Sequence, residues 1–201
     1  MKTLLHVGCG HQSTEVLPPL DFKTEWKEIR VDLDPSVEAD VIDDIKTLSK
    51  IADGAGHLLF SKHNVEHLDF HEIPICFGNF HRVLDDSGFA IVRTPDLVAV
   101  CRTILEHGPE TKLYEAQTLD GPREVTGLDM LFGASWELVA GNDFMAHRTA
   151  FSGRTLTAKL LAAGFEHVEV TSQDGELRAL ALKKKEGNLY WQISGREPAA
   201  A

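Results

Sequence analysis

The chain of 201 residues is 43% hydrophobic, which is enough for one domain with a substantial core. Its net charge of −11 disfavours nucleic acid and anionic membranes as partners, because the average surface repels phosphate groups. The three cysteines are widely spaced and form no C-x-x-C pair, so they predict neither a disulfide framework nor a zinc ribbon. With no signal peptide and no membrane span predicted, we expect a cytoplasmic protein.

Four short strands are predicted in the first third of the chain. Residues 2–7 form an apolar run that ends in a glycine turn, and residues 28–35 alternate apolar and polar side chains before an acidic pair and a proline. Residues 39–45 and 57–61 indicate two further strands. Pro18-Pro19 limits any helix that connects the first strand to the second.

Helical periodicity begins at residue 72 and ends at residue 84, where apolar side chains recur at spacings of three and one. Residues 85–88 then predict a turn and residues 89–95 a fifth strand. Since strands and helices alternate along the chain, we expect an α/β fold built on a parallel sheet.

The last half of the chain divides into an irregular part and a regular part. Residues 97–152 contain helix pieces interrupted by glycines, which is typical of a cap or substrate-binding insertion. A helix up to Gly164 follows, and Asp174-Gly175 between two alternating runs predicts a hairpin of antiparallel strands. The sequence therefore predicts a single domain over residues 1–186 and a fraying C-terminal tail over residues 187–201.

The predicted carboxyl ends of the first two strands carry residues suited to an adenosine-type cofactor. Gly8 and Gly10 lack a Cβ, so the backbone can approach a ligand closely, and Asp32 can accept hydrogen bonds from both hydroxyls of a ribose. The loop has Gln12 and Ser13 where a third glycine is common in dinucleotide and adenosyl binders. Pro18-Pro19 lowers the case for a nicotinamide dinucleotide, because a pyrophosphate needs a regular helix N-terminus.

Several segments together resemble the class I S-adenosylmethionine-dependent methyltransferases. The similar segments, in chain order, are LLHVGCG, EIRVDLDP, DVIDDI, LLFSKHNVEHL, FHRVLDDSGFAIVRTP and the closing hairpin. The resemblance implies an α/β, Rossmann-like sheet of seven strands in the order 3-2-1-4-5-7-6, with strand 7 antiparallel, helices on both faces and an insertion after strand 5. It also implies an enzyme that transfers a methyl group from S-adenosylmethionine to a small-molecule acceptor.

The resemblance assigns the cofactor to seven residues. They are Gly8, Cys9 and Gly10 at the methionine moiety, Asp32 or alternatively Asp34 at the ribose, and Asp44 with Ile45 at the adenine. The chain departs from the family pattern at His6, where many members have an acidic residue, at Gln12, and at Ser87-Gly88 in place of a glycine pair.

The segment from residue 60 to residue 72 contains His63, Glu66, His67 and His71. Its H-x-x-E-H spacing is that of a zinc metallopeptidase motif, but such a motif lies within a helix and has a further ligand downstream. The segment follows the fourth strand, where methyltransferases place residues near the methyl group. His63 and His147 are therefore candidate general bases, because an imidazole titrates near neutral pH.

A metal ion is the alternative use of the same histidines. Some methyltransferases that act on small-RNA 3′ ends or in the ubiquinone pathway have an E-x-x-E-H motif here and a later histidine, and they bind a divalent cation. The corresponding residues are His63, Glu66, His67 and His147, and this donor set favours Zn²⁺, Mn²⁺ or Fe²⁺ over Mg²⁺. A further alternative is that Glu66 and His67 only cap and pack a helix.

The sequence does not identify the acceptor molecule. Candidates for lining its pocket within the insertion are Asp129, Trp136, Asn142 and Arg148. Competing functions are a non-catalytic adenosyl-binding or interaction module and an NAD-dependent oxidoreductase. The sequence also leaves a homodimer open.

Overall fold

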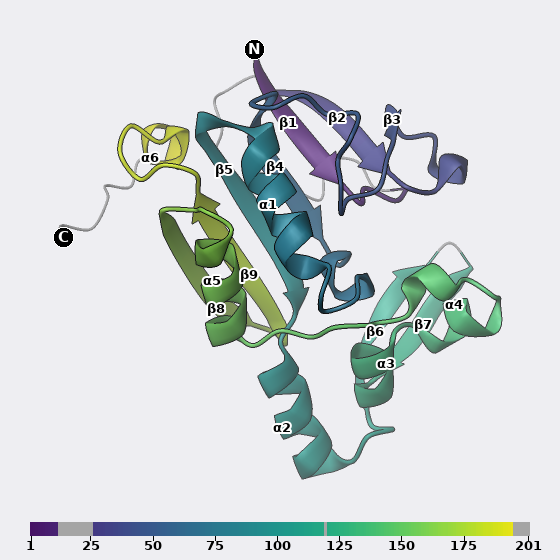
Figure 1. The fold of residues 1–201 in the computed structure, drawn as a ribbon. Coiled ribbons are helices and arrows are strands. Elements are labelled where there is room, and N and C mark those ends of the chain that lie inside the picture. Colours follow the sequence, from purple (N-terminus) through teal and green to yellow (C-terminus); the bar gives the residue numbers. More distant parts are fainter. Residues whose placement is uncertain (12–25, 119, 195–201) are drawn as a thin grey trace.

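A seven-stranded sheet forms the centre of the computed structural model, which describes residues 1–11, 26–118 and 120–194 (Figure 1). Its order is β3-β2-β1-β4-β5-β9-β8. The strands are β1 (Lys2–Val7), β2 (Trp26–Asp32), β3 (Val41–Ile42), β4 (Gly56–Lys62), β5 (Leu84–Pro95), β8 (His167–Gln173) and β9 (Glu176–Leu182). Only β9 runs antiparallel to its neighbours, which confirms the predicted order once the two additional strands of the insertion are numbered.

Helices cover both faces of the sheet, because successive strand residues point to opposite sides. Helices α1 (Ile73–Val83) and α5 (Gly153–Ala162) pack on one face, where they join Leu5, Leu59 and other strand residues in the main core. The helix α6 (Leu189–Ser194) packs on the other face, against a second core that includes Leu4 and Leu58. The buried residues of α1 follow the predicted helical spacing.

Two local expectations need correction. The turn predicted at residues 85–88 lies inside β5, which already begins at Leu84 and shifts its register against β4 between Gly56 and Leu58. The tail predicted to fray after Glu186 instead contains α6, whose Leu189 and Tyr190 are buried in the second core. Burial of these apolar side chains stabilises a helix too short for periodicity to reveal.

The insertion lies beyond the carboxyl edge of the sheet (Figure 1). It begins with α2 (Leu97–His107), continues as a hairpin of β6 (Lys112–Thr118) and β7 (Gly121–Thr126), and ends with α3 (Gly127–Phe132) and α4 (Ser135–Val139). The sequence predicted only helix pieces here. The hairpin was missed because its strands are mostly exposed and polar, so they show no apolar alternation.

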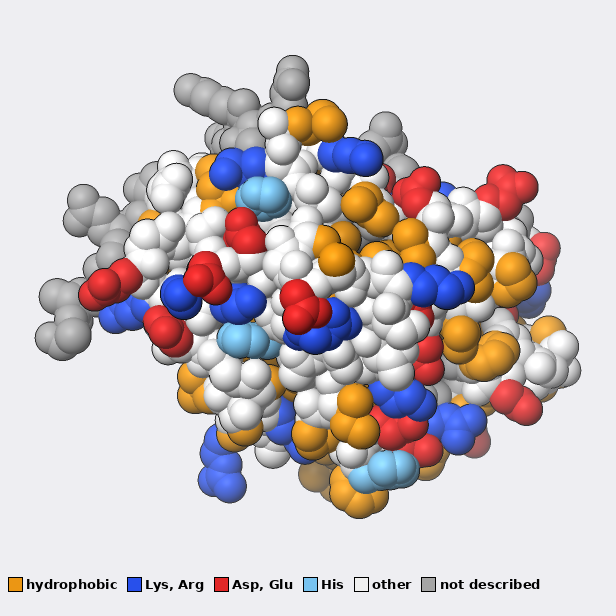
Figure 2. Space-filling view, turned by 45° about the horizontal axis from the view of Figure 1, so that its top comes forward, with side chains coloured by type: hydrophobic (Ala, Val, Ile, Leu, Met, Phe, Trp, Pro, Cys, Tyr) orange, Lys and Arg blue, Asp and Glu red, His pale blue; other side chains and the backbone are white. Residues whose placement is uncertain are grey.

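The surface agrees with the acidic, mixed composition of the chain. On the face shown in Figure 2, acidic and basic side chains alternate over short distances, and no broad basic area forms there. Among the described residues, no helix combines the length and the apolar character needed to cross a membrane. Gln12, Ser13 and Pro18-Pro19 lie outside the described residues.

Candidate functional site

The loop after β1 has a conformation that glycine adopts without strain. Gly8 and Gly10 have φ values of +61° and +53°, in the left-handed region. A Cβ on Gly8 would lie 2.3 Å from Nδ2 of Asn64, whereas a Cβ on Gly10 would meet no atom of the described residues within 4 Å. Asn64 is buried, donates to the carbonyl of Val7 at 2.8 Å and accepts from the hydroxyl of Ser61 at 2.7 Å. Asn64 thus fixes the loop from one side, and the open side lies over Gly10.

Asp32 stands beside this open space at the end of β2. Its Oδ2 accepts a hydrogen bond from the backbone N–H of Gly10 at 2.8 Å, and its Oδ1 accepts one from the N–H of Asp34 at 3.0 Å. Each carboxylate oxygen can accept a second hydrogen bond, so the half-buried Asp32 can still bind two hydroxyls. Arg30 holds the loop further by donating to the carbonyl of Gly10 at 2.6 Å.

The other predicted cofactor residues differ in their access to this space. Asp34 is exposed and caps the short helix at Pro35–Val37, where the N–H of Ser36 lowers its pKa. The side chain of Asp44 is half-buried and accepts from the N–H of Lys46 at 2.8 Å. Cys9 is buried, and the side chain of Ile45 packs into the main core, so both can offer only backbone groups to a ligand.

His6, which stands where an acidic residue is common in the family, has an acidic partner on the neighbouring strand. Its Nδ1 lies 2.9 Å from Oε1 of Glu28 on the neighbouring strand β2. Burial lowers the pKa of His6, although the hydrogen bond and charge of Glu28 oppose this effect. A neutral His6 therefore donates to Glu28, which comes from β2 in register with Leu4.

His63 is a cation held between two carboxylates. It follows β4 with a φ of +51°, which is uncommon for a residue with a side chain. Its Nε2 lies 2.9 Å from Oε1 of Glu176, and its Nδ1 lies 3.4 Å from Oε1 of Glu66. Burial opposes the charge on His63, but the two carboxylates outweigh burial and raise its pKa to about 9. A protonated imidazole has no lone pair, which argues against the predicted role of His63 as general base.

Glu66, His67 and His147 form a compact group of candidate metal ligands. One side-chain ligand atom from each lies within 4.8 Å of the other two. Glu66 and His67 belong to the three-residue helix Val65–His67, which is not the long helix of an H-x-x-E-H peptidase. His147 comes from the insertion, and the N–H groups of Arg148 and Thr149 both donate to the carbonyl of Glu66, at 2.8 and 3.1 Å.

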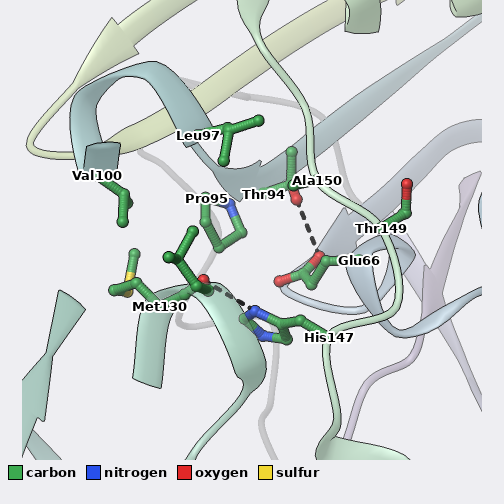
Figure 3. Close-up of a pocket in the computed structure, with 10 residues that line it drawn as sticks. Glu66, Thr94, Pro95, Leu97, Val100, Met130, His147, Thr149 and Ala150 are labelled. Carbon is green, nitrogen blue, oxygen red and sulfur yellow. Dashed lines mark hydrogen bonds between the residues drawn. The ribbon is translucent and has the colours of Figure 1, made fainter. Parts of the chain in front are cut away.

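The hydrogen bonds of this group leave its ligand atoms available. Nδ1 of His67 lies 3.2 Å from the carbonyl of Ala146, and Nδ1 of His147 lies 3.0 Å from that of Met130. A carbonyl only accepts, so both Nδ1 atoms carry the proton, and both Nε2 atoms have a lone pair when the rings are neutral. Oε2 of Glu66 accepts from Thr94 at 3.0 Å, whereas the buried Oε1 makes no hydrogen bond with any described residue and has only the longer ion pair with Nδ1 of His63 at 3.4 Å. Figure 3 shows this carboxylate facing the His147 imidazole.

A small cavity adjoins the group, with a volume of about 10 Å³. Its lining combines Glu66, Thr94 and His147 with apolar side chains, among them Leu97 and Met130 (Figure 3). None of the four predicted acceptor residues lines it. Asp129 caps α3 and accepts from Thr126 and Ser135, Asn142 donates to Glu137, Arg148 is exposed, and Trp136 lies on α4.

Comparison with known proteins identifies the fold. No protein-family model and no curated protein matches the sequence. An S-adenosylmethionine-dependent methyltransferase from Archaeoglobus fulgidus is 14% identical, with a TM-score of 0.54 over 90% of this chain and 85% of that one. The 1,6-didemethyltoxoflavin-N1-methyltransferase of Burkholderia thailandensis, solved with S-adenosylhomocysteine, is 13% identical, with a TM-score of 0.52 over 90% and 70% of the two chains.

A possible exported protein from Bordetella parapertussis is 14% identical, with a TM-score of 0.59 over 90% of this chain, which spans 61% of that protein's length. Together with the strand order, these likenesses decide the fold. The chain has the class I methyltransferase fold.

Within this methyltransferase fold, the glycine loop, Asp32 and the group around Glu66 all lie at the carboxyl edge of the sheet, where ligands bind in open α/β sheets. Sequence reasoning missed Asn64, Arg30, Thr94 and Glu176, which position the loop, His63 and Glu66. Asn64 stands within the histidine-rich segment, but no sequence signal shows that its amide packs on Gly8. Glu176 comes 113 residues after His63, and only the strand pairing of β9 with β5 brings it near.

Proposed function

We propose that this protein transfers a methyl group from S-adenosylmethionine to a small-molecule acceptor. The observation that carries the proposal is the Asp32 carboxylate next to Gly10, over which no described atom lies within 4 Å, at the carboxyl edge of a sheet with the methyltransferase strand order. Structural neighbours in this class, one of them with S-adenosylhomocysteine, support the cofactor assignment. When bound, the cofactor supplies an electrophilic methyl group on a sulfonium.

The chain's own residues align the reactants. Asp32 accepts hydrogen bonds from the ribose, and the loop of Gly8 and Gly10 lets the backbone approach the methionine moiety. Asp44 and the backbone of Ile45 are our candidates for the adenine. Alignment of nucleophile, methyl group and sulfur is the main requirement of a direct displacement, and a positioned base removes the acceptor's proton.

His147 is the better of the two predicted bases. The carbonyl of Met130 fixes its tautomer with the lone pair on Nε2, next to the cavity. Burial lowers the pKa of His147, although the negative charge of Glu66 opposes this effect, so the ring is neutral and able to accept a proton at neutral pH. His63 keeps a positioning role instead, because its charge links Glu66 to Glu176.

The experiment that tests the function is a calorimetric titration of the protein with S-adenosylmethionine, S-adenosylhomocysteine and NAD. We expect both adenosyl ligands to bind and NAD not to bind. Binding of NAD alone would favour an oxidoreductase and refute the proposal. Binding of neither class would favour an interaction module that has lost the cofactor.

A divalent ion is the second candidate, and it is favoured by Oε1 of Glu66, which makes no hydrogen bond with a described residue and has only the 3.4 Å ion pair with His63. Glu66 Oε1 and the Nε2 atoms of His67 and His147 would hold the ion, in the pattern where a backbone carbonyl orients each imidazole ligand. A bound Zn²⁺, Mn²⁺ or Fe²⁺ would draw in an acceptor oxygen and lower its pKa. His63 is not part of this set, since both of its nitrogens face carboxylates.

Both roles use the same lone pair of His147, so the ion must be measured directly. Elemental analysis and calorimetric titration with Zn²⁺ and Mn²⁺ do this. We expect His147→Gln to lose bound or titratable metal, while His71→Gln, a matched change of an exposed histidine, keeps it. Equal metal content in wild type and both variants would refute the ion site, and His147 would then remain as the base. A cytoplasmic location and a homodimer stay predictions.

A further inference from the structure

Three basic side chains form a row across the sheet at its carboxyl edge. Lys62 of β4 pairs in register with Arg93 of β5, and Arg93 pairs with Arg178 of β9. Residues paired in register point to the same side of a sheet, so these three side chains lie next to one another. They share the face of the second core, on which α6 packs against the other end of the strands. We call Lys62, Arg93 and Arg178 the basic row.

One carboxylate neutralises only part of the basic row. Arg93 and Arg178 both donate to Oε2 of Glu176, Arg93 through Nε at 2.8 Å and also through Nη2, and Arg178 through Nε at 2.8 Å. Lys62 makes no hydrogen bond and no ion pair with any described residue. Glu176 also pairs with the His63 cation, which Glu66 shares, so four cations face two carboxylates and two positive charges have no counter-charge in the described part of the chain.

The unpaired positive charge of the basic row destabilises the folded chain. Lys62 and Arg93 are half-buried, and adjacent like charges on neighbouring strands destabilise a sheet. Burial, followed by the charge of Arg93, lowers the pKa of Lys62. An overall charge of −11 makes this positive excess stand out, because the chain has eleven more acidic than basic residues available for pairing.

The basic row adjoins the proposed acceptor site. His63 follows Lys62 directly, and its ring contacts Glu176 on one side and Glu66 on the other. The row and the Glu66 group are therefore connected through His63 and Glu176. Arg93 and Thr94, which donates to Glu66, are consecutive residues of β5, so the row and the Glu66 group lie at the same strand end on opposite faces of the sheet. An anion bound by Lys62 and the remaining guanidinium N–H groups would lie across this sheet edge from the Glu66 group, with His63 between them.

We propose that the basic row binds an anionic group, a phosphate or a carboxylate, on the acceptor molecule. This inference rests on the proposed methyl transfer and narrows its substrate class to anionic small molecules. Lys62 supplies a charge with three donors, and Arg93 and Arg178 supply planar donors suited to two-oxygen contacts. Glu176 holds the two guanidinium groups in place through their Nε atoms.

The test is calorimetric titration with inorganic phosphate, phenyl phosphate and benzoate, with and without saturating S-adenosylhomocysteine. We expect phosphate to bind wild type and Lys62→Met to weaken it about tenfold or more, as loss of one charge-assisted contact would. The matched control is Lys184→Met, since exposed Lys184 pairs with Asp86 near the start of β5, at the other end of the strand from Arg93, and should bind like wild type. Because Lys62 has no partner to lose, Lys62→Met should fold with a melting temperature no lower than that of wild type.

Each remaining outcome decides the proposal. Equal phosphate affinity in wild type and Lys62→Met would overturn it, and so would rejection of phenyl phosphate and benzoate, because an anion carried on an acceptor needs room for an organic group. Displacement of phosphate by S-adenosylhomocysteine would assign the row to the cofactor's own carboxylate. That result would require Lys62→Met to weaken S-adenosylhomocysteine but not 5′-methylthioadenosine, which lacks the carboxylate. Absence of S-adenosylhomocysteine binding with phosphate binding intact would refute the methyltransferase function alone.

Discussion

Replacing each loop glycine by alanine should separate the structural role of Gly8 from the ligand-facing role of Gly10. Both residues have positive φ values, so each alanine costs about 1 kcal/mol in backbone strain. On Gly8 the new Cβ would also lie 2.3 Å from Nδ2 of Asn64, which must then move away. Moving Asn64 breaks its bonds to Val7 and Ser61, and two buried groups left unpaired cost about 3 kcal/mol together.

We therefore expect Gly8→Ala to lower the free energy of unfolding by about 4 kcal/mol and Gly10→Ala by about 1 kcal/mol. The assay is urea unfolding followed by tryptophan fluorescence and circular dichroism. Asn64→Gly should cost about 4 kcal/mol by itself, including about 1 kcal/mol for the added backbone freedom, and adding Gly8→Ala to it should cost only about 1 kcal/mol more, because every clashing atom of residue 64, its Cβ at 2.8 Å included, is gone. Additive losses in the double variant, or equal losses for the two glycine variants, would refute the assigned contact.

Gly10→Ala gives the complementary result for the ligand. Its methyl group enters the open space over the loop, where no described atom lies within 4 Å. We expect a folded variant that binds S-adenosylhomocysteine at least about tenfold more weakly than wild type. Unchanged affinity would mean that the space over Gly10 is not the cofactor's.

Three further changes test the charges around the site. Burial holds the pKa of His6 below its ordinary value, so the unfolded chain takes up a proton first as the pH falls. The free energy of unfolding should therefore decline below about pH 6.5, by up to about 1.4 kcal/mol per pH unit. In urea unfolding His6→Gln should lack this part of the decline, and a parallel decline in wild type and variant would contradict the reasoning. Glu176→Gln should cost about 3 kcal/mol at pH 7, because Arg93 and Arg178 lose their carboxylate and His63 keeps only its 3.4 Å pair with Glu66. Since the cations around Glu176 outweigh its burial and lower its pKa to about 2, that cost should shrink between about pH 4.5 and pH 2, and a pH-independent loss would refute the charge interaction. His67→Gln should reduce zinc or manganese affinity as His147→Gln does, and a variant that retains full affinity would remove His67 from the ligand set.

The order of the sheet could be predicted because it depends on local patterns that each strand carries. The run before Gly8 and the Asp174-Gly175 turn give the first strand and the last hairpin without knowledge of the rest of the chain. The β6–β7 hairpin and α6 could not be predicted in the same way. The hairpin is exposed and polar, and α6 is stabilised by tertiary packing of two buried side chains.

The sequence predicts which candidate residues lie together at the ends of neighbouring strands, but not the contacts between residues far apart in the chain. Gly8 and Gly10 come just after β1, and Asp32 is the last residue of β2. Their proximity follows from the parallel pairing of these two strands. His63 was assigned as a base because the sequence does not show that Glu176 approaches it from β9 and keeps it protonated. The acceptor candidates in the insertion stay predictions, although the sequence does not show that the carboxylate of Asp129 caps α3.

The cofactor assignment is tested most directly by the affinity of S-adenosylhomocysteine for wild type, Asp32→Asn and Asp34→Asn, measured by calorimetry. Asp32 lies beside the open loop, whereas Asp34 caps a short helix in solvent. We predict that wild type binds, that Asp32→Asn weakens binding about tenfold or more through a lost ribose hydrogen bond, and that Asp34→Asn binds like wild type. No binding to wild type, or equal affinity in all three proteins, would contradict the assignment.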